Sequence, residues 1–364
     1  MPIGASARMR PRLPVVYAVR QNRPCDGYNS SSWSPVRPAT IDYGGARVKD
    51  FIEQCTRAVT STVAPSWARW LLARAAIAPP IWKTPMFERA CASLVRNSLG
   101  ATEDVVVTNF GLGVNLRCLI GLRKTAYAFG KIEHMLSERA TFTLVGELAA
   151  DCKEFVDVGA NEGAFTFLVH RDFPQMQLHW FEPDRQLARR LATNLATNNI
   201  VACGNEMAAA ERTGTATFFK NLSDDSSGSL TNLFAQKHVT RAEIVKTISL
   251  AEYFRARGIG DALVKVDVEG AGEKVWDGAV EMSKAVRYLV MEMLLPEIKA
   301  ALPGKIIRQT DLKAYYIRDF ELVPSVDGAF EYVAPFWNWL FCRLSPTELA
   351  ERLSATRFRV RNRG

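Results

Sequence analysis

The sequence predicts an α/β fold with a mostly parallel β-sheet, a C-terminal antiparallel hairpin and a small helical segment in front. Between residues 155 and 293, short apolar runs of strand length alternate with segments of helical period. This alternation favours a parallel sheet that is covered by helices on both faces. Near the C-terminus two apolar runs, 320–326 and 337–344, are separated by a non-helical segment. We expect these two runs to pair as the hairpin.

The elements of the α/β part are expected in a regular order. They are a helix at 134–150, a strand at 155–158, a helix at 163–171, a strand at 177–181, a helix at 184–198, a strand at about 201–209 with a polar loop after it, a helix at 250–257, the strand ALVKVDV (262–268), a helix near 272–282 and the strand VRYLVMEM (286–293). Asp184 stands where a helix N-cap is expected.

Four segments divide the chain. Residues 1–47 hold six of the seventeen prolines and show no sustained period, which favours a linker or disorder. Residues 48–135 combine a helical pattern with two β-branched runs around a Gly-x-Gly turn at 104–122, so we expect a helical and hairpin extension. The α/β domain then covers 136–345, and 346–364 form a basic C-terminal tail.

The charge of the chain lies mainly at its two ends. The formal net charge is +8 at pH 7. Residues 1–47 carry seven arginines against two aspartates, and residues 351–364 carry five arginines against one glutamate. The part between is close to neutral, which is not typical of a nucleic-acid groove. We therefore expect no nucleic-acid partner.

The cysteines and histidines give no sign of a metal site. The seven cysteines are scattered without a C-x-x-C pair, and the four histidines lack ligand spacing. We interpret the cysteines as reduced thiols. The most apolar window near the front, 67–82, is interrupted by arginines and prolines and is too short to span a bilayer. These features predict no metal, no transmembrane segment and a cytoplasmic location.

A glycine-rich turn follows the strand at 155–158. The stretch FVDVGANEGAF places Asp157 at the strand end, followed by Gly159, Asn161 and Gly163 before a helix. Glycines allow a ligand to approach the backbone closely. Glu182 comes nineteen residues after Gly163, where such folds bind ribose hydroxyls with a carboxylate. An acid before the turn would repel a pyrophosphate, so S-adenosylmethionine fits better than NAD.

These residues belong to a series of motifs. DVGANEGAFT is followed by FEPD, GTATFF (214–219), SSGSL (226–230) and KVDVEGA (265–271). In this order the chain resembles the FkbM family of S-adenosylmethionine-dependent methyltransferases over about 136–345. The resemblance implies a Rossmann-like methyltransferase fold and, commonly, O-methylation of sugar hydroxyls in glycans or natural products.

The resemblance also implies roles for individual residues. Asp157, Gly159, Asn161 and Gly163 would line the methionine end of the cofactor, and Glu182 would hold its ribose. Many members of the family have a second acidic residue directly after E-G-A, where this chain has Gly272. A role that rests on that second carboxylate is therefore not carried over.

The motif KVDVEG suggests a second constellation. Lys265, Asp267 and Glu269 alternate along a predicted strand, so their side chains are expected on one face. Glu292 lies near the end of the next predicted strand, on the same edge. Lys265 could simply neutralise the two acids, the acids could hold a divalent cation or only position the substrate, and Glu292 could be a rim charge. We predict Glu269 as the base or hydroxyl-orienting group, Asp267 as the group that positions the methionine moiety, and Glu292 as the next candidate base.

The predicted function is S-adenosylmethionine-dependent O-methylation of a hydroxyl on a sugar, glycan or natural-product acceptor. An NAD-dependent oxidoreductase is one alternative, although the chain lacks the third phosphate-turn glycine. A methyltransferase acting on nucleic acid is disfavoured by the neutral body of the chain. A non-catalytic binding module on a methyltransferase scaffold is the alternative from another class.

Overall fold

The computed structural model describes most of the chain from residue 138 onward and two short strands before it. The described residues are 104–108, 117–121, 138–222, 228–232, 240–294, 297, 301–333 and 336–361, the first two ranges as backbone. The linker expected at 1–47 and the helices expected from residue 48 lie outside them. β1 (Asp104–Thr108) and β2 (Arg117–Gly121) pair antiparallel, as the hairpin pattern predicted.

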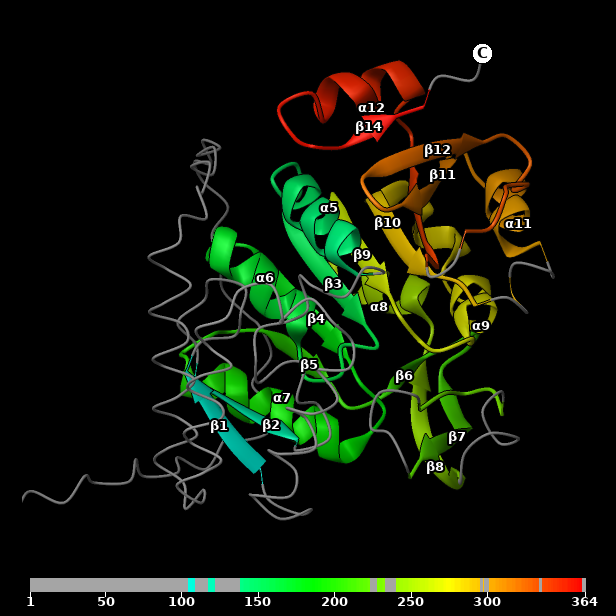
Figure 1. Ribbon diagram of the computed structural model, residues 1–364. Coiled ribbons are helices and arrows are strands. Elements are labelled where there is room, and N and C mark those ends of the chain that lie inside the picture. Colours follow the sequence, from blue (N-terminus) through cyan, green and yellow to red (C-terminus); the bar gives the residue numbers. More distant parts are fainter. Residues whose placement is uncertain are drawn as a thin grey trace, which may run out of the picture. The chain divides into compact units, whose positions relative to one another are not determined.

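The largest sheet has nine strands among the described residues, in the order β14-β12-β11-β13-β10-β9-β3-β4-β5 (Figure 1). Its strands are β3 (Glu154–Val158), β4 (Gln177–Phe181), β5 (Cys203–Asn205), β9 (Ala262–Val266), β10 (Val286–Glu292), β11 (Lys313–Arg318), β12 (Glu321–Ser325), β13 (Asn338–Cys342) and β14 (Arg359–Val360). The neighbours β10, β9, β3, β4 and β5 are parallel, which confirms the predicted sheet.

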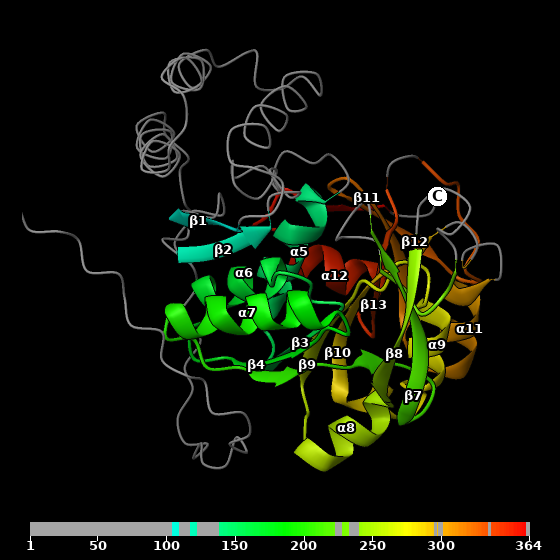
Figure 2. The ribbon, with the colours of Figure 1, turned by 90° about the horizontal axis from the view of Figure 1, so that it is seen from below.

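Helices cover both faces of this sheet. One face carries α5 (Arg139–Ala149), α6 (Ala164–Asp172), α7 (Arg185–Thr197) and α12 (Pro346–Arg352). The other carries α8 (Leu250–Arg257), α9 (Gly272–Asp277), a 3-10 helix (Val280–Ala285) and α11 (Leu302–Gln309). Figure 2 shows α7 and α8 on opposite sides of β3 and β4. Phe155 packs in the first core and Val156 in the second, because side chains alternate along a strand.

A second, smaller sheet replaces most of the polar loop that we expected after the strand at 201–209. It contains β6 (Ala208–Ala209), β7 (Gly214–Asn221) and β8 (Thr240–Ile248) in the order β6-β8-β7. The predicted strand is thus split between the two sheets, with β5 in one and β6 in the other. The prediction missed β7 and β8 because most of their side chains are partly or fully exposed, so they lack a continuous apolar pattern.

The C-terminal antiparallel hairpin is present, but its strands differ from the predicted pair. The hairpin consists of β11 and β12. β13 does not pair with β12; it lies between β10 and β11 and is antiparallel to both. The prediction was wrong on this point because strand order depends on partners that are remote in sequence. The helix expected near 272–282 is also divided, into α9 and the 3-10 helix.

The segment that we expected as a basic tail from residue 346 contains ordered elements of the main sheet and its core. Ser345 and Glu348 form a capping box at the start of α12. Leu349, Leu353 and Phe358 are buried in the same core as α5 and α6. β14 pairs in parallel with β12. Residues 346–360 therefore pack on the α/β domain, because their apolar side chains have a place in its core.

The cysteines only partly follow the expectation of reduced thiols. Cys152 and Cys342 are free and buried. Cys203, the first residue of β5, is disulfide-bonded, which corrects the prediction for this residue. Among the helices that the structure describes, none has the length and apolar character needed to cross a membrane.

Candidate active site

The turn between β3 and α6 lies directly against the chain that follows β9. Gly159, Asn161 and Gly163 all have positive φ, at 78°, 53° and 88°. A Cβ at position 159 would lie 1.8 Å from the backbone oxygen of Asp267, and one at 163 would lie 2.3 Å from Leu191 Cδ1. Both glycines are therefore required by a close approach as well as by their backbone angles.

Asp157 is the next-to-last residue of β3, one residue before the predicted and observed strand end at 158, and its side chain points toward α6. Its Oδ2 accepts hydrogen bonds from the Thr166 backbone N–H at 3.1 Å and from Thr166 Oγ1 at 2.7 Å. Burial raises the pKa of Asp157 to about 6, although the bonds from Thr166 and the charge of Lys265 oppose the shift. The carboxylate thus joins the strand end to the first turn of the helix.

Glu182 lies at the end of β4 and fixes the backbone on both sides of the turn. Its Oε2 accepts the N–H of Asn161 at 2.8 Å, and its Oε1 accepts the N–H of Asp184 at 2.8 Å. Asp184 in turn caps α7 by accepting the N–H groups of Gln186 and Leu187, as predicted. Glu182 is therefore close to the glycine turn, as its position in the sequence suggested.

A buried ion pair between the turn and α7 was missed by the sequence reasoning. Arg190 Nη1 lies 2.7 Å from Glu162 Oε1, and both side chains are almost fully buried. Glu162 belongs to the turn itself, between Asn161 and Gly163. The pair links the turn to α7, but a charged residue in an amphipathic helix gives no sign in the sequence that it will be buried.

Lys265 is the centre of the second constellation. It is directly opposite Asp157 in the β3–β9 register and lies on the same face of the sheet. Its Nζ is fully buried, 3.3 Å from Asp267 Oδ2 and 5.1 Å from the centre of the Phe165 ring. Burial acts to lower the pKa of Lys265, but the surrounding carboxylates outweigh it, led by Asp267 and Glu138, so the pKa is raised. The lysine is a buried cation.

The structure brings Asp267, Glu269 and Glu292 together, although not in the way the alternation suggested. β9 ends at Val266, so Asp267 and Glu269 lie in the following turn, and Glu269 has a φ of 52°. One carboxylate oxygen from each of the three residues lies within 4.8 Å of the other two. The turn, rather than the pleat of a strand, brings Glu269 to this edge of the sheet.

Glu292 shows the electrostatic effect of this grouping most strongly. Its pKa is raised well above the ordinary value, first by burial and then by the charge of Asp267, with which it shares a hydrogen bond. Glu269 adds to the shift and Lys265 opposes it. Carboxylates this close do not all ionise freely at neutral pH. Glu292 is therefore suited to hold a proton.

Two further residues of this edge were not predicted. Glu138, directly before α5, is close enough to Lys265 and Asp267 for their charges to act on it. Asn338, on β13, is opposite Glu292 in the register and points its Nδ2 toward Glu138 Oε1, 3.5 Å away. Neither belongs to a motif; the strand order places Asn338 here, and the packing of α5 places Glu138. We call Glu138, Asp267, Glu269 and Glu292 the acidic group.

Glu138 predicts a pH dependence of stability. Burial and the charge of Asp267 raise its pKa from 4.5 to about 7, against Lys265 and Asn338. The folded state then keeps a proton that the unfolded chain has lost, so the free energy of unfolding should fall as the pH rises from about 4.5 to about 7. Glu138→Gln should reduce this fall by about 1 to 3 kcal/mol. Urea unfolding at pH 4.5 and pH 7, with a chelator present, measures this change in the free energy of unfolding for the wild type and the variant. An equal change in both proteins would contradict the prediction.

Gly272, where the chain departs from the family pattern, lies beside another carboxylate. A Cβ at this position would lie 2.7 Å from Glu297 Oε1. Glu297 is buried and accepts the backbone N–H groups of Glu273 and Leu294. It therefore caps the start of α9. Met291, which is also near Gly272, belongs to the core on the opposite face from the acidic group.

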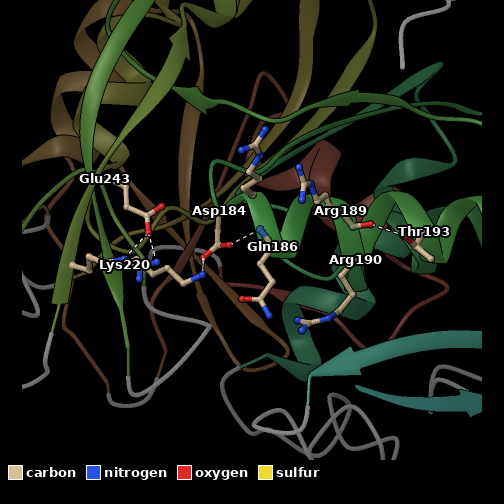
Figure 3. A pocket seen from close by; sticks show the side chains of 9 residues that line it. Asp184, Gln186, Arg189, Arg190, Thr193, Lys220 and Glu243 are labelled. Atoms are coloured by element: carbon tan, nitrogen blue, oxygen red, sulfur yellow. Dashed lines mark hydrogen bonds and ion pairs between the residues drawn. The ribbon is translucent and has the colours of Figure 1, made fainter. Parts of the chain in front are cut away.

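A pocket of about 440 Å³ lies between α7 and the small sheet, apart from the acidic group. Figure 3 shows Gln186, Arg189 and Arg190 of α7 and its N-cap Asp184 on one side, and Lys220 and Glu243 on the other. Lys220 pairs with Asp184, and Arg241 pairs with Glu243. These two pairs leave three arginines in the lining, of which Arg190 pairs with Glu162 and Arg185 with Glu206.

The residues of the edge fit a cofactor that carries an amino group and a ribose. The acidic side chains Asp157, Glu182 and Asp267 surround the turn, and Lys265 is fully buried beneath them. A pyrophosphate would meet these negative charges, whereas an ammonium and ribose hydroxyls would be attracted. At Gly159 a Cβ would collide with the Asp267 backbone oxygen, so this position of the turn has no room for a larger residue.

Comparisons with known proteins agree with this chemistry. Residues 157–309 match the model of the methyltransferase FkbM domain. The search of curated protein sequences gives no match.

Solved structures that the comparison matches include an S-adenosylmethionine-dependent O-methyltransferase from Thermotoga maritima, with 10% identity, coverage of 66% of this chain and 77% of that one, and a TM-score of 0.33. They also include a putative transferase from Pyrococcus horikoshii, with 9% identity, coverage of 70% and 82%, and a TM-score of 0.37. With identities of 9–10% and TM-scores below 0.5, these structures do not assign the chain to a family, so the assignment rests on the family match. Residues 157–309 form a methyltransferase FkbM domain, and the chain is a methyltransferase whose cofactor is S-adenosylmethionine.

Proposed function

We propose that the protein transfers the methyl group of S-adenosylmethionine to a hydroxyl oxygen of a sugar, glycan or natural-product acceptor. The observation that carries this proposal is the acidic group beside the glycine turn. A hydroxyl is a weak nucleophile until a base takes its proton, and the base must lie within hydrogen-bond reach of that proton. A group of partly exposed carboxylates next to the cofactor turn supplies such a base.

We assign the cofactor to the turn between β3 and α6. Asp157, Gly159, Asn161 and Gly163 would lie along its methionine end, and Glu182 would accept hydrogen bonds from its ribose. The cofactor supplies an electrophilic methyl group on a positively charged sulfur. The turn is already held in shape by Glu182 and by the pair Glu162–Arg190, which limits the reorganisation needed on binding.

We assign the proton transfer to the acidic group. Glu269 would accept the hydroxyl proton or orient the hydroxyl, Asp267 would position the methionine moiety, and Glu292 is the alternative base. A base with a raised pKa holds the transferred proton better, which favours Glu292 as the alternative base. The buried Lys265 would favour the ionised form of Asp267, because the Lys265 ammonium lies 3.3 Å from that carboxylate.

Glu182→Ala should weaken the binding of S-adenosylhomocysteine by about 1 to 3 kcal/mol, the scale of a lost charge-assisted hydrogen bond. Calorimetric titration measures the affinity, and thermal unfolding checks that the variant is folded. Glu206→Ala is the matched control, because Glu206 is exposed and pairs with Arg185. Affinity at the wild-type level in Glu182→Ala would exclude Glu182 from the cofactor site.

A pair of matched acceptors tests the reaction itself. Sugars and their analogues lacking single hydroxyls are incubated with the protein and S-adenosylmethionine carrying a deuterated methyl group. We expect a labelled methyl ether and an equal amount of S-adenosylhomocysteine from one hydroxylated acceptor, and neither product from the analogue that lacks that hydroxyl. Binding of the cofactor with no product from any acceptor would favour the non-catalytic scaffold, and transfer to nitrogen or carbon would contradict O-methylation.

The acceptor class and the location are inferences from the sequence. We propose a carbohydrate-like acceptor and no nucleic-acid partner, because the charge of the chain lies at its ends. The predicted cytoplasmic location stays a prediction, and the disulfide of Cys203 stands against it, since disulfides persist mainly in oxidising compartments. Cell fractionation with an antibody to the protein distinguishes a cytoplasmic location from an oxidising compartment.

A further inference from the structure

The acidic group carries more negative charge than its surroundings neutralise. Its four carboxylates, Glu138, Asp267, Glu269 and Glu292, meet one cation among the described residues, Lys265. Lys265 is fully buried, whereas the Asp267 side chain is 30% exposed. The lysine therefore lies beneath Asp267, and solvent reaches the acidic group at Asp267. A second cation can approach there.

The three carboxylates nearest the edge have the spacing of ligands to one ion. One oxygen each from Asp267, Glu269 and Glu292 lies within 4.8 Å of the others. Oxygens that bind one Mg²⁺ or Mn²⁺ at a little over 2 Å cannot be more than about 4.5 Å apart, so a small inward movement completes the set. Carboxylate oxygens are the ligands that these hard cations prefer.

Asn338 is an independent sign of a missing ligand partner. Its side chain is 2% exposed, and its Oδ1 has no hydrogen-bond partner among the described residues. Asn338 is opposite Glu292 in the β10–β13 register and points its Nδ2 toward Glu138, so the amide lies within the acidic group. A buried amide oxygen without a partner loses free energy. An amide oxygen is also a ligand for hard divalent cations.

We propose that Asp267, Glu269 and Glu292, with Asn338 opposite Glu292 on the neighbouring strand, form a binding site for a hard divalent cation of the Mg²⁺ or Mn²⁺ type. The binding stands on the residues alone. Its use rests on the proposed function: a cation here would hold the acceptor hydroxyl oxygen next to the carboxylate that takes its proton. Two neighbouring hydroxyls of a sugar would offer it two oxygens.

Binding of Mn²⁺ to chelator-treated, full-length protein tests the site. Electron paramagnetic resonance measures the concentration of free Mn²⁺ during a titration. We expect one saturable Mn²⁺ site, for which Mg²⁺ competes. Asp267→Asn and Glu292→Gln should each weaken Mn²⁺ binding about tenfold or more, and Asn338→Leu should weaken it less. Glu273→Gln is the matched control, because Glu273 pairs with Lys305 outside the acidic group.

The wild-type titration decides first, since it does not depend on the folding of any variant. The absence of saturable Mn²⁺ binding to the wild type would overturn the cation site. So would wild-type Mn²⁺ affinity in both Glu292→Gln and Asn338→Leu, provided that cooperative unfolding shows both variants to be folded. The methylation assay separates this outcome from the proposed function. Methyl transfer by a protein that binds no Mn²⁺ contradicts the cation site alone, whereas Mn²⁺ bound at the acidic group without hydroxyl transfer contradicts the proposed function alone.

Discussion

Glu269→Gln is expected to lower the turnover of the methylation reaction by about 10² or more, the scale of lost general-base help. Glutamine keeps the shape of glutamate but accepts no proton. Glu269 lies in the turn after β9, with its carboxylate grouped with those of Asp267 and Glu292. The affinity for S-adenosylhomocysteine should stay close to that of the wild type, because the cofactor is assigned to the neighbouring turn after β3.

Single-turnover kinetics with the identified acceptor, at saturating Mn²⁺, measures the effect. Asp267→Asn is the comparison, because it should weaken cofactor binding as well as turnover. The two variants thus separate a group that handles the hydroxyl from one that holds the cofactor. Turnover near the wild-type level in Glu269→Gln would rule out Glu269 as the base, and Glu292→Gln would then be the variant to test.

Arg190→Met should lower the free energy of unfolding by about 3 to 5 kcal/mol, because it removes the ion-pair partner of a buried glutamate. Arg190 Nη1 lies 2.7 Å from Glu162 Oε1, and the two side chains are 5% and 0% exposed. Urea unfolding measures the loss. Cofactor affinity should fall too, since Glu162 belongs to the turn assigned to S-adenosylmethionine.

A double variant and an exposed pair serve as controls. Arg190→Met with Glu162→Met removes both charges, so it should be more stable than Arg190→Met alone by about 2 kcal/mol. Arg255→Met breaks the pair with Glu281, in which both side chains are about 70% exposed, and should change stability by less than about 1 kcal/mol. A loss in Arg190→Met no larger than in Arg255→Met would contradict the structural role of the buried pair.

Local signals in the sequence determined the elements of the parallel sheet and the position of the glycine turn. The strand at 177–181 and the helix at 250–257 have the predicted bounds. Asp184 caps α7 as predicted, since an N-cap depends on residues within one helical turn. The capping box of Ser345 and Glu348 was an equally local signal, but the sequence reasoning did not use it.

The tertiary structure alone decided the neighbours of the site. β13 lies between β10 and β11, and this order places Asn338 beside Glu292. Glu138 reaches the same edge from the start of α5, far from Asp267 in the sequence. No local pattern contains this information, because strand pairing and the burial of polar side chains depend on segments that meet only after folding. The sequence by itself determined the glycine turn and the motif acids, and the packing decided which other polar groups surround them.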